Sequence, residues 1–351
     1  MKKYLFITIS AALALTACTN ETTEYVGDTQ AREIAFAPLA QKPTRAAVQT
    51  ATLPSQDMFV VAYQASTPAK EYFGKTTFTK GETYWGASKY WPLSESTINF
   101  FAVTGITSAN TAHVSFPATS ASEGTKSIES ATVAYTTANS YAASSQQDIM
   151  YSVGQGAVTK SGNTLTFPEK VDMTFYHAMA MINFQVKANS AVEASGGSGA
   201  ITINNIKLNG AQYTGTLTIT NNTACTTTGT QVKPTISWVG ETAPTGENRP
   251  NVPNVPSTLS TTFAPASESN WACLMVIPST FESFTINFTV DGNTYDYTYV
   301  PGGFTDSTPN TTSLTAGNKY TYQITFKLHE IEINPIVDTW TDNNNSITVA
   351  N

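Results

Sequence analysis

Short segments in which apolar and polar residues alternate recur along most of this chain, separated by residues that favour turns. The clearest pair is residues 284–290 (FTINFTV) and 294–300 (TYDYTYV), joined by Asp291-Gly292-Asn293. A period of two is typical of half-buried strands, and Asp-Gly supplies the positive φ of a tight hairpin turn. We therefore predict a hairpin here. Similar segments at 58–63, 98–103, 131–135 and within 314–326 predict an all-β protein.

The composition agrees with this prediction. β-branched and aromatic residues are interspersed with threonine, serine, asparagine and glycine, and only 12% of residues are charged. The chain is long enough for two domains, each with its own core. We place their boundary before the long apolar run of residues 171–186, which gives an N-terminal domain of residues 46–168 and a C-terminal domain of residues 169–329.

The first predicted strand is residues 33–38 (EIAFAP). Ile34 and Phe36 fall on one face of this strand. Pro38 has no N–H to donate to a neighbouring strand, so we predict that the strand ends there and lies at the edge of a sheet.

The loop that follows, residues 41–47 (QKPTRAA), contains no large apolar residue. Such loops are where proteases reach a chain most easily, and Arg45 is the exposed basic residue of this one. A trypsin-like protease is therefore expected to cut between Arg45 and Ala46. Arg32 is the competing site, but cutting there would leave the first strand in place.

Residues 1–17 show the succession of regions that is typical of a signal peptide. A positive start is followed by a largely apolar run that is too short to span a bilayer as a helix. The segment ends in Leu-Thr-Ala before Cys18, which resembles the lipobox of bacterial lipoproteins. The resemblance implies removal of residues 1–17 and acylation of Cys18, so that acyl chains anchor the protein to a membrane. The alternative is an ordinary secretory signal in which the cysteine is incidental.

The net charge limits the possible binding partners, and the cysteine content limits the possible disulfide bonds. The net charge is −7, and no cluster of Lys or Arg follows the leader, so the phosphate backbone of a nucleic acid would be repelled. Nucleic acid is therefore excluded as a partner. Beyond Cys18 the chain has only Cys225 and Cys273, which either pair in an oxidising compartment or remain separate buried thiols; we favour separate thiols.

No arrangement typical of an enzyme occurs in the sequence. It has no Gly-x-Ser-x-Gly elbow, phosphate-binding glycine loop, paired histidines on a helix or calcium loop. His177 lies with Met179 and Met181 in an alternating apolar run that superficially suggests a soft metal site, but no cysteine or acid lies at ligand spacing. We interpret His177 as a packed strand residue, and we predict no catalytic residue, no metal site and no cofactor.

Several stretches together resemble the fimbrillin family, the subunits of the protease-matured (type V) fimbriae of Bacteroidales. They are Tyr90-Trp91-Pro92 with 98–102 (INFFA), 148–151 (DIMY), 175–184 (FYHAMAMINF), and 314–326 with Trp340 beyond. Each stretch is weak alone. Their order and spacing, combined with the lipobox and Thr44-Arg45-Ala46, make the resemblance fairly specific over nearly the whole mature chain.

The resemblance implies two tandem β-sandwich domains of the transthyretin-like, Greek-key kind. It also implies export as an outer-membrane lipoprotein, cleavage after an arginine by a trypsin-like protease, and polymerisation with its own kind or other fimbrial subunits by strand exchange. Residues 18–45 would then be a lipid tether with a removable first strand. An arginine in the loop and a long tail favour a stalk or tip subunit of a cell-surface fimbria that supports adhesion. The alternative is a monomeric surface lipoprotein whose exposed aromatic residues bind glycans.

The C-terminal tail, residues 330–351, begins with 330–335 (EIEINP), which repeats the pattern of the first strand: acid, Ile, spacer, large apolar residue, spacer, proline. The match predicts that Ile331 and Ile333 of one subunit replace Ile34 and Phe36 of a neighbour after cleavage. Further predicted anchors are Ile336, Val337, Trp340, Ile347 and Val349. The match is otherwise explained by chance, or by a tail that extends the last strand of its own body.

Overall fold

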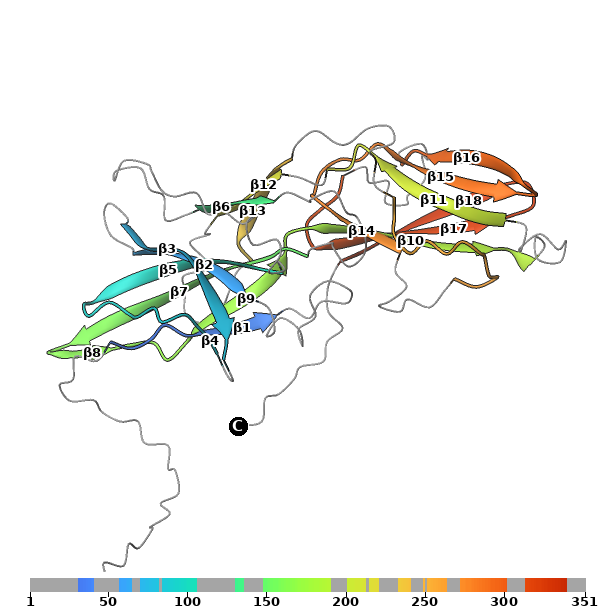
Figure 1. The fold of residues 1–351 in the computed structure, drawn as a ribbon. Helices are drawn as coiled ribbons and strands as arrows, with labels where there is room; N and C mark the ends of the chain where they lie inside the picture. The colour runs from blue at the N-terminus through green and yellow to red at the C-terminus, as the bar shows by residue number, and fades with distance from the viewer. Residues whose placement is uncertain are drawn as a thin grey trace, which may run out of the picture.

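The computed structural model describes residues 31–40, 57–64, 70–81, 84–105, 130–135, 148–190, 201–212, 215–220, 233–240, 249, 251–263, 272–301 and 313–339. The named elements in these ranges are all β-strands, which confirms the predicted all-β class (Figure 1). None of these ranges contains a helix of the length and apolarity needed to span a bilayer.

The first sheet has eight strands and closes on itself. Its order is β5-β2-β3-β4-β1-β9-β7-β8, and β5 also pairs with β7 along Ser96–Thr104, which joins the sheet into a barrel. The structure here differs from the predicted sandwich of two sheets, because the long β5–β7 ladder leaves neither strand with a free edge. The strands are β1 (Phe36–Ala40), β2 (Met58–Gln64), β3 (Lys70–Lys80), β4 (Trp85–Gly86), β5 (Ser96–Thr104), β7 (Met150–Ser161), β8 (Thr164–Thr166) and β9 (Val171–His177).

β1 lies inside this sheet, between β4 and β9, so the predicted edge position is wrong. It runs parallel to β9 and antiparallel to β4, which it meets only at Phe36↔Trp85. The backbone hydrogen-bonding groups of Ile34 and Phe36 point to the side of the strand on which β4 lies. Because this direction alternates from one residue to the next, the nitrogen of Pro38 points to the same side. The β4 ladder has already ended at Phe36, and the missing N–H of Pro38 therefore interrupts no ladder.

The side chains of Ile34 and Phe36 lie in the core of the barrel with no solvent exposure. The Phe36 ring packs edge-on against Phe78 and Phe100, at centroid distances of 4.8 and 5.0 Å. The first strand therefore fills the inside of the barrel. Other large members of this core are Met58, Phe73, Trp85, Trp91, Ile98, Met150, Met173 and Phe175.

Because Gly156 of β7 has no side chain, the Trp91 ring can pack directly against its backbone. A Cβ atom on this residue would lie 2.2 Å from the ring. We expect Gly156→Ala to lower the free energy of unfolding by about 1–3 kcal/mol, because the ring is buried and cannot move without disturbing its neighbours. Urea denaturation measures the change. Gly74→Ala is the matched control, since its Cβ would meet only the Glu71 side chain, at 3.2 Å. An equal loss in both variants would contradict the role assigned to Trp91.

The remaining strands form three smaller sheets, with the orders β14-β10-β17-β18, β11-β15-β16 and β13-β12-β6. The first two share a core in which Phe284 of β15 contacts Phe184 of β10 and Tyr322 of β17, at centroid distances of 4.9 and 5.0 Å. The strands are β6 (Ser130–Tyr135), β10 (Ala180–Ala188), β11 (Ile201–Asn209), β12 (Gly215–Thr220), β13 (Thr235–Gly240), β14 (Ala272–Val276), β15 (Ser283–Val290), β16 (Asn293–Tyr299), β17 (Asn318–Phe326) and β18 (Ile331–Thr339).

The hairpin predicted within residues 284–300 is confirmed as β15 and β16. Its seven residue pairs run from Phe284↔Tyr299 to Val290↔Asn293. Asp291 and Gly292 have φ values of 49° and 83°, the positive values that the tight turn requires. The strand predicted at 131–135 is also confirmed, as β6.

The apolar run of residues 171–186 supplies strands to two different sheets. β9 pairs with β1 and β7 in the barrel, although it lies inside the predicted C-terminal domain of residues 169–329, and β10 starts the next sheet at Ala180. A shared apolar cluster joins the two parts: Phe59 and Phe101 of the barrel belong to it together with Met181 of β10 and Met275 of β14. β2 and β14, which contribute to this cluster, are therefore buried on both faces.

Candidate functional site

The first strand is held to the barrel mainly by β9. Five consecutive residue pairs join the two strands, from Phe36↔Val171 to Ala40↔Phe175. The ladder is extended by Val171, whose N–H donates to the carbonyl of Ala35 at 2.8 Å. A continuous parallel ladder of this kind satisfies the backbone groups of β1 that face β9.

The contact of the first strand with β4 is much shorter, because β4 has only two residues. Beyond Phe36↔Trp85, the next pairing on this side is the isolated bridge Glu33↔Tyr90. Near this bridge, the N–H of Ile34 donates to the carbonyl of Lys89 at 2.7 Å, and the Glu33 carboxylate accepts a hydrogen bond from the backbone N–H of Ser88 at 2.8 Å. The β4 seam is therefore the weaker side of β1.

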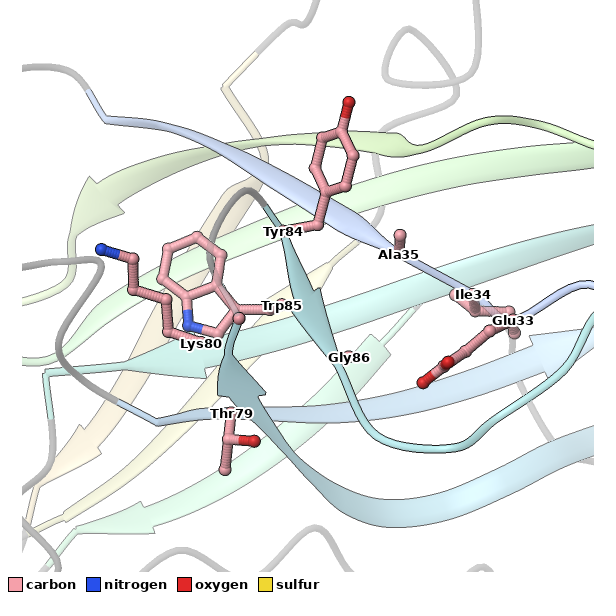
Figure 2. A pocket seen from close by; sticks show the side chains of 9 residues that line it. Glu33, Ile34, Ala35, Thr79, Lys80, Tyr84, Trp85 and Gly86 are labelled. Carbon is pink, nitrogen blue, oxygen red and sulfur yellow. The ribbon is translucent and has the colours of Figure 1, made fainter. Parts of the chain in front are cut away.

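A pocket of about 400 Å³ opens along this seam (Figure 2). Residues of the first strand form one wall, and β3, β4 and the turn between them form the other. On the first strand, the methyl group of Ala35 lines the pocket. The lining residues are Glu33, Ile34, Ala35, Thr79, Lys80, Gly81, Tyr84, Trp85 and Gly86.

The tail begins as β18, which lies at the edge of the four-stranded sheet. It pairs antiparallel with β17 over nine residue pairs, from Phe326↔Ile331 to Asn318↔Thr339. In the single chain the tail therefore does not extend the last strand, which one alternative from the sequence expected. Instead it turns back after Phe326 and adds a further antiparallel strand to the edge of its own sheet. In the turn, Lys327 pairs with Glu330 at 2.5 Å and with Glu332 at 2.9 Å.

The apolar residues of β18 are buried less completely than those of the first strand. Ile331, Ile333 and Val337 pack against the core of the two C-terminal sheets but remain only partly buried, whereas Ile34 and Phe36 have no solvent exposure. Ile336, another predicted anchor, alternates with these residues and faces the opposite side of the sheet.

Some predicted residues lie outside the described ranges. They are Cys18, Arg45, Ala46, Cys225, Trp340, Ile347 and Val349. Cys273 is described: its thiol is buried in the cluster shared by the barrel and the four-stranded sheet. Burial raises the pKa of this thiol to about 12, so very little thiolate forms at neutral pH.

His177 is a buried strand residue. Its Nδ1 lies 2.9 Å from Oδ1 of Asp148, and both residues are almost completely buried. Met179 and Met181 pack in the shared apolar cluster. Within the described ranges no three His, Cys, Asp or Glu residues come together as metal ligands. The pairing with Asp148 was not predicted, because nothing in the local sequence marks two residues that approach only when β7 meets β9.

Comparison with known proteins identifies a family. The sequence profile of the fimbrillin-like family matches residues 44–340. Among curated proteins, no match was found.

Solved structures similar to this chain come from species of Bacteroides and Porphyromonas. A Bacteroides uniformis protein assigned to cell adhesion is 18% identical with a TM-score of 0.48, over 88% of this chain and 99% of that one. A fimbrial protein of Bacteroides vulgatus is 15% identical with a TM-score of 0.47, over 88% and 99%. The tip fimbrial protein Mfa3 of Porphyromonas gingivalis is 12% identical with a TM-score of 0.39, over 88% and 100%.

Proposed function

The chain belongs to the fimbrillin-like family, and from this premise we propose that it is a stalk or tip subunit of a cell-surface fimbria that polymerises by strand exchange. It is exported as an outer-membrane lipoprotein acylated at Cys18. A trypsin-like protease then cuts between Arg45 and Ala46, and the first strand is replaced by the tail of another subunit. The partners are further copies of this chain or other fimbrial subunits.

The observation that carries this proposal is the contrast between the first strand and the tail. β1 is a short segment near the N-terminus, yet Ile34 and Phe36 fill the barrel core with no exposure. β18 carries the same pattern at an edge, with Ile331 and Ile333 only partly buried. Fully burying such a side chain is worth roughly 1.5–3 kcal/mol relative to leaving it exposed. Moving the tail from its own sheet edge into a neighbour's barrel therefore gains apolar burial.

Removal of β1 would open the barrel, and the open barrel favours insertion of a tail from another subunit. Without β1, the backbone groups of β9 that now bond to residues 35–40 would lack partners, and so would the short β4 seam. Unpaired strand edges next to an apolar groove invite the addition of another strand. Cleavage at Arg45 lies after β1 in the chain, so it separates this strand from the body without cutting the barrel itself.

The Arg45→Ala variant tests the proposal in cells that express this gene. The wild-type protein is expected to start at Ala46 and to form a ladder of polymers that withstands SDS until the sample is heated, whereas the variant should keep its N-terminal segment and give no ladder. N-terminal sequencing and unheated SDS gels measure the two outcomes. Arg32→Ala is the matched control and should behave like the wild type. An intact, lipidated wild-type monomer would contradict the proposal and favour the glycan-binding alternative.

A further inference from the structure

The outer face of the first strand consists of alanines beside a charged pair. Ala37 lies opposite Asp172 of β9, and continuing this register by two residues places Ala35 beside Lys170. Lys170 and Asp172 pair at 3.0 Å, with side chains 40% and 47% exposed. Ala35 and Ala37 have no polar side-chain atoms, so the side chains of the native strand can form neither a hydrogen bond nor an ion pair with Lys170 or Asp172.

The seam beside β4 has room for a larger side chain than the one that occupies it. The methyl group of Ala35 lines the pocket of about 400 Å³ shown in Figure 2. A strand with the same backbone path but a longer residue at this position would extend into the pocket, whose lining also includes the polar residues Thr79, Lys80 and Tyr84.

The tail carries polar residues at the positions where the first strand has these alanines. Aligning 330–335 (EIEINP) with 33–38 (EIAFAP) places Glu332 at the position of Ala35 and Asn334 at that of Ala37. Glu332 would then lie across from Lys170, and Asn334 across from Asp172. Opposite charges directly across two strands are favourable, as is a hydrogen bond between an amide and a carboxylate.

We propose that the tail of a second copy enters the barrel in the direction and register of β1, with Glu332 beside Lys170 and Asn334 beside Asp172. This inference rests on the strand exchange proposed above and specifies its geometry. Glu332 now pairs with Lys327 of its own chain at 2.9 Å, so the transfer exchanges one lysine partner for another. Exposed ion pairs contribute little to affinity, and their role here is to select the register.

Insertion of the tail in the opposite direction, antiparallel to β9, is less favourable. With Glu332 kept at the position of Ala35, a reversed tail would place Glu330 at the position of Ala37, beside the carboxylate of Asp172. Like charges directly across two strands are destabilising. Reversal would also move Pro335 away from the position of Pro38, where the β4 ladder has ended and a missing N–H interrupts nothing.

Pairs of introduced cysteines in the full chain test the register. The matched variants are Lys170→Cys with Glu332→Cys, and Thr174→Cys with Ile336→Cys, because Ile336 would take the position of Leu39 opposite Thr174. The mismatched variants are Lys170→Cys with Ile336→Cys, and Thr174→Cys with Glu332→Cys. Cys225→Ser is included in all four, and the buried thiol of Cys273 stays in place.

We expect both matched variants to give polymers that survive heating in SDS and fall apart on reduction, and both mismatched variants to give polymers that heating dissociates. If only the variant with Lys170→Cys and Glu332→Cys forms cross-links, the tail is reversed. If a mismatched variant forms cross-links, the tail is shifted in register. Either result overturns the proposed direction and register but leaves strand exchange intact. If no variant forms fibres visible by electron microscopy although all are cut at Arg45, strand exchange fails, and the register fails with it.

A charge exchange provides a second measurement. Lys170→Glu and Glu332→Lys are each expected to lower the fraction of polymer about two- to fivefold, as suits an exposed cross-strand pair, and the double variant should recover it. If the double variant is as impaired as the sum of the single variants, Glu332 does not lie beside Lys170. Lys160→Glu, on the exposed end of β7, is the control for a change of net charge and should polymerise normally.

Discussion

A chain that ends at Leu328 is expected to fold and to be cut after Arg45, but to form no fimbriae. β18 lies at the edge of its sheet and contributes partly buried side chains, so its removal leaves the barrel and most of the C-terminal core in place. Under the proposed strand exchange, the truncated chain could accept a strand but would have none to donate. Unheated SDS gels and electron microscopy should therefore show cut monomers and a complete loss of polymers.

Truncation removes the donor strand and also exposes the edge of β17. Substitutions within the full-length tail separate these two effects. Ile331→Asp with Ile333→Asp keeps the length of β18 but places two carboxylates where the proposal requires apolar side chains in a neighbour's barrel. Burying unpaired charges is strongly unfavourable, so this variant should also fail to polymerise. His329→Asp, in the exposed turn before β18, is the matched control and should form normal ladders. Fibres from the truncated or the doubly substituted chain, after the cut at Arg45, would show that the tail is not the donor.

Phe36→Ala in the uncut precursor is expected to lower the free energy of unfolding by about 3–5 kcal/mol. The ring has no solvent exposure and packs edge-on against Phe78 and Phe100, so its removal would leave a cavity in the middle of the barrel. Equilibrium unfolding in urea measures the loss.

Leu93→Ala is the control for Phe36→Ala, because Leu93 is 54% exposed and its truncation should change the stability by less than about 0.5 kcal/mol. A loss below about 1 kcal/mol for Phe36→Ala would mean that the first strand is not an integral part of the barrel core. That result would remove the main physical reason for its replacement by another strand.

Local features of the sequence predicted the local structure. Alternation and an Asp-Gly turn located β15 and β16 to within one or two residues, because both strands of a hairpin and its turn are encoded in one short segment. The burial of Ile34 and Phe36 was also predictable, since both lie on one face of an alternating segment.

Features that depend on distant pairings were not predictable. Nothing near Phe36 indicates that it runs parallel to Val171, so Pro38 was interpreted as the sign of an edge strand. The closure of the barrel depends on the pairing of β5 with β7, and the pocket beside Ala35 on how short β4 is. The tail's pattern fits both its own sheet and the barrel, so alternation alone could not select the place where it lies in the single chain.

The apolar cluster shared by the barrel and the four-stranded sheet has a mechanical consequence. Leu217 and Ile219 of β12 belong to it together with Phe101 of β5 and Met181 of β10. Bending the chain between the barrel and the four-stranded sheet would pull these side chains apart and expose them to water, which is costly. Each subunit should therefore transmit tension and torque as one stiff body. In a filament of such subunits, bending would be concentrated at the joints between them, and the spacing of those joints would set how sharply the filament can curve.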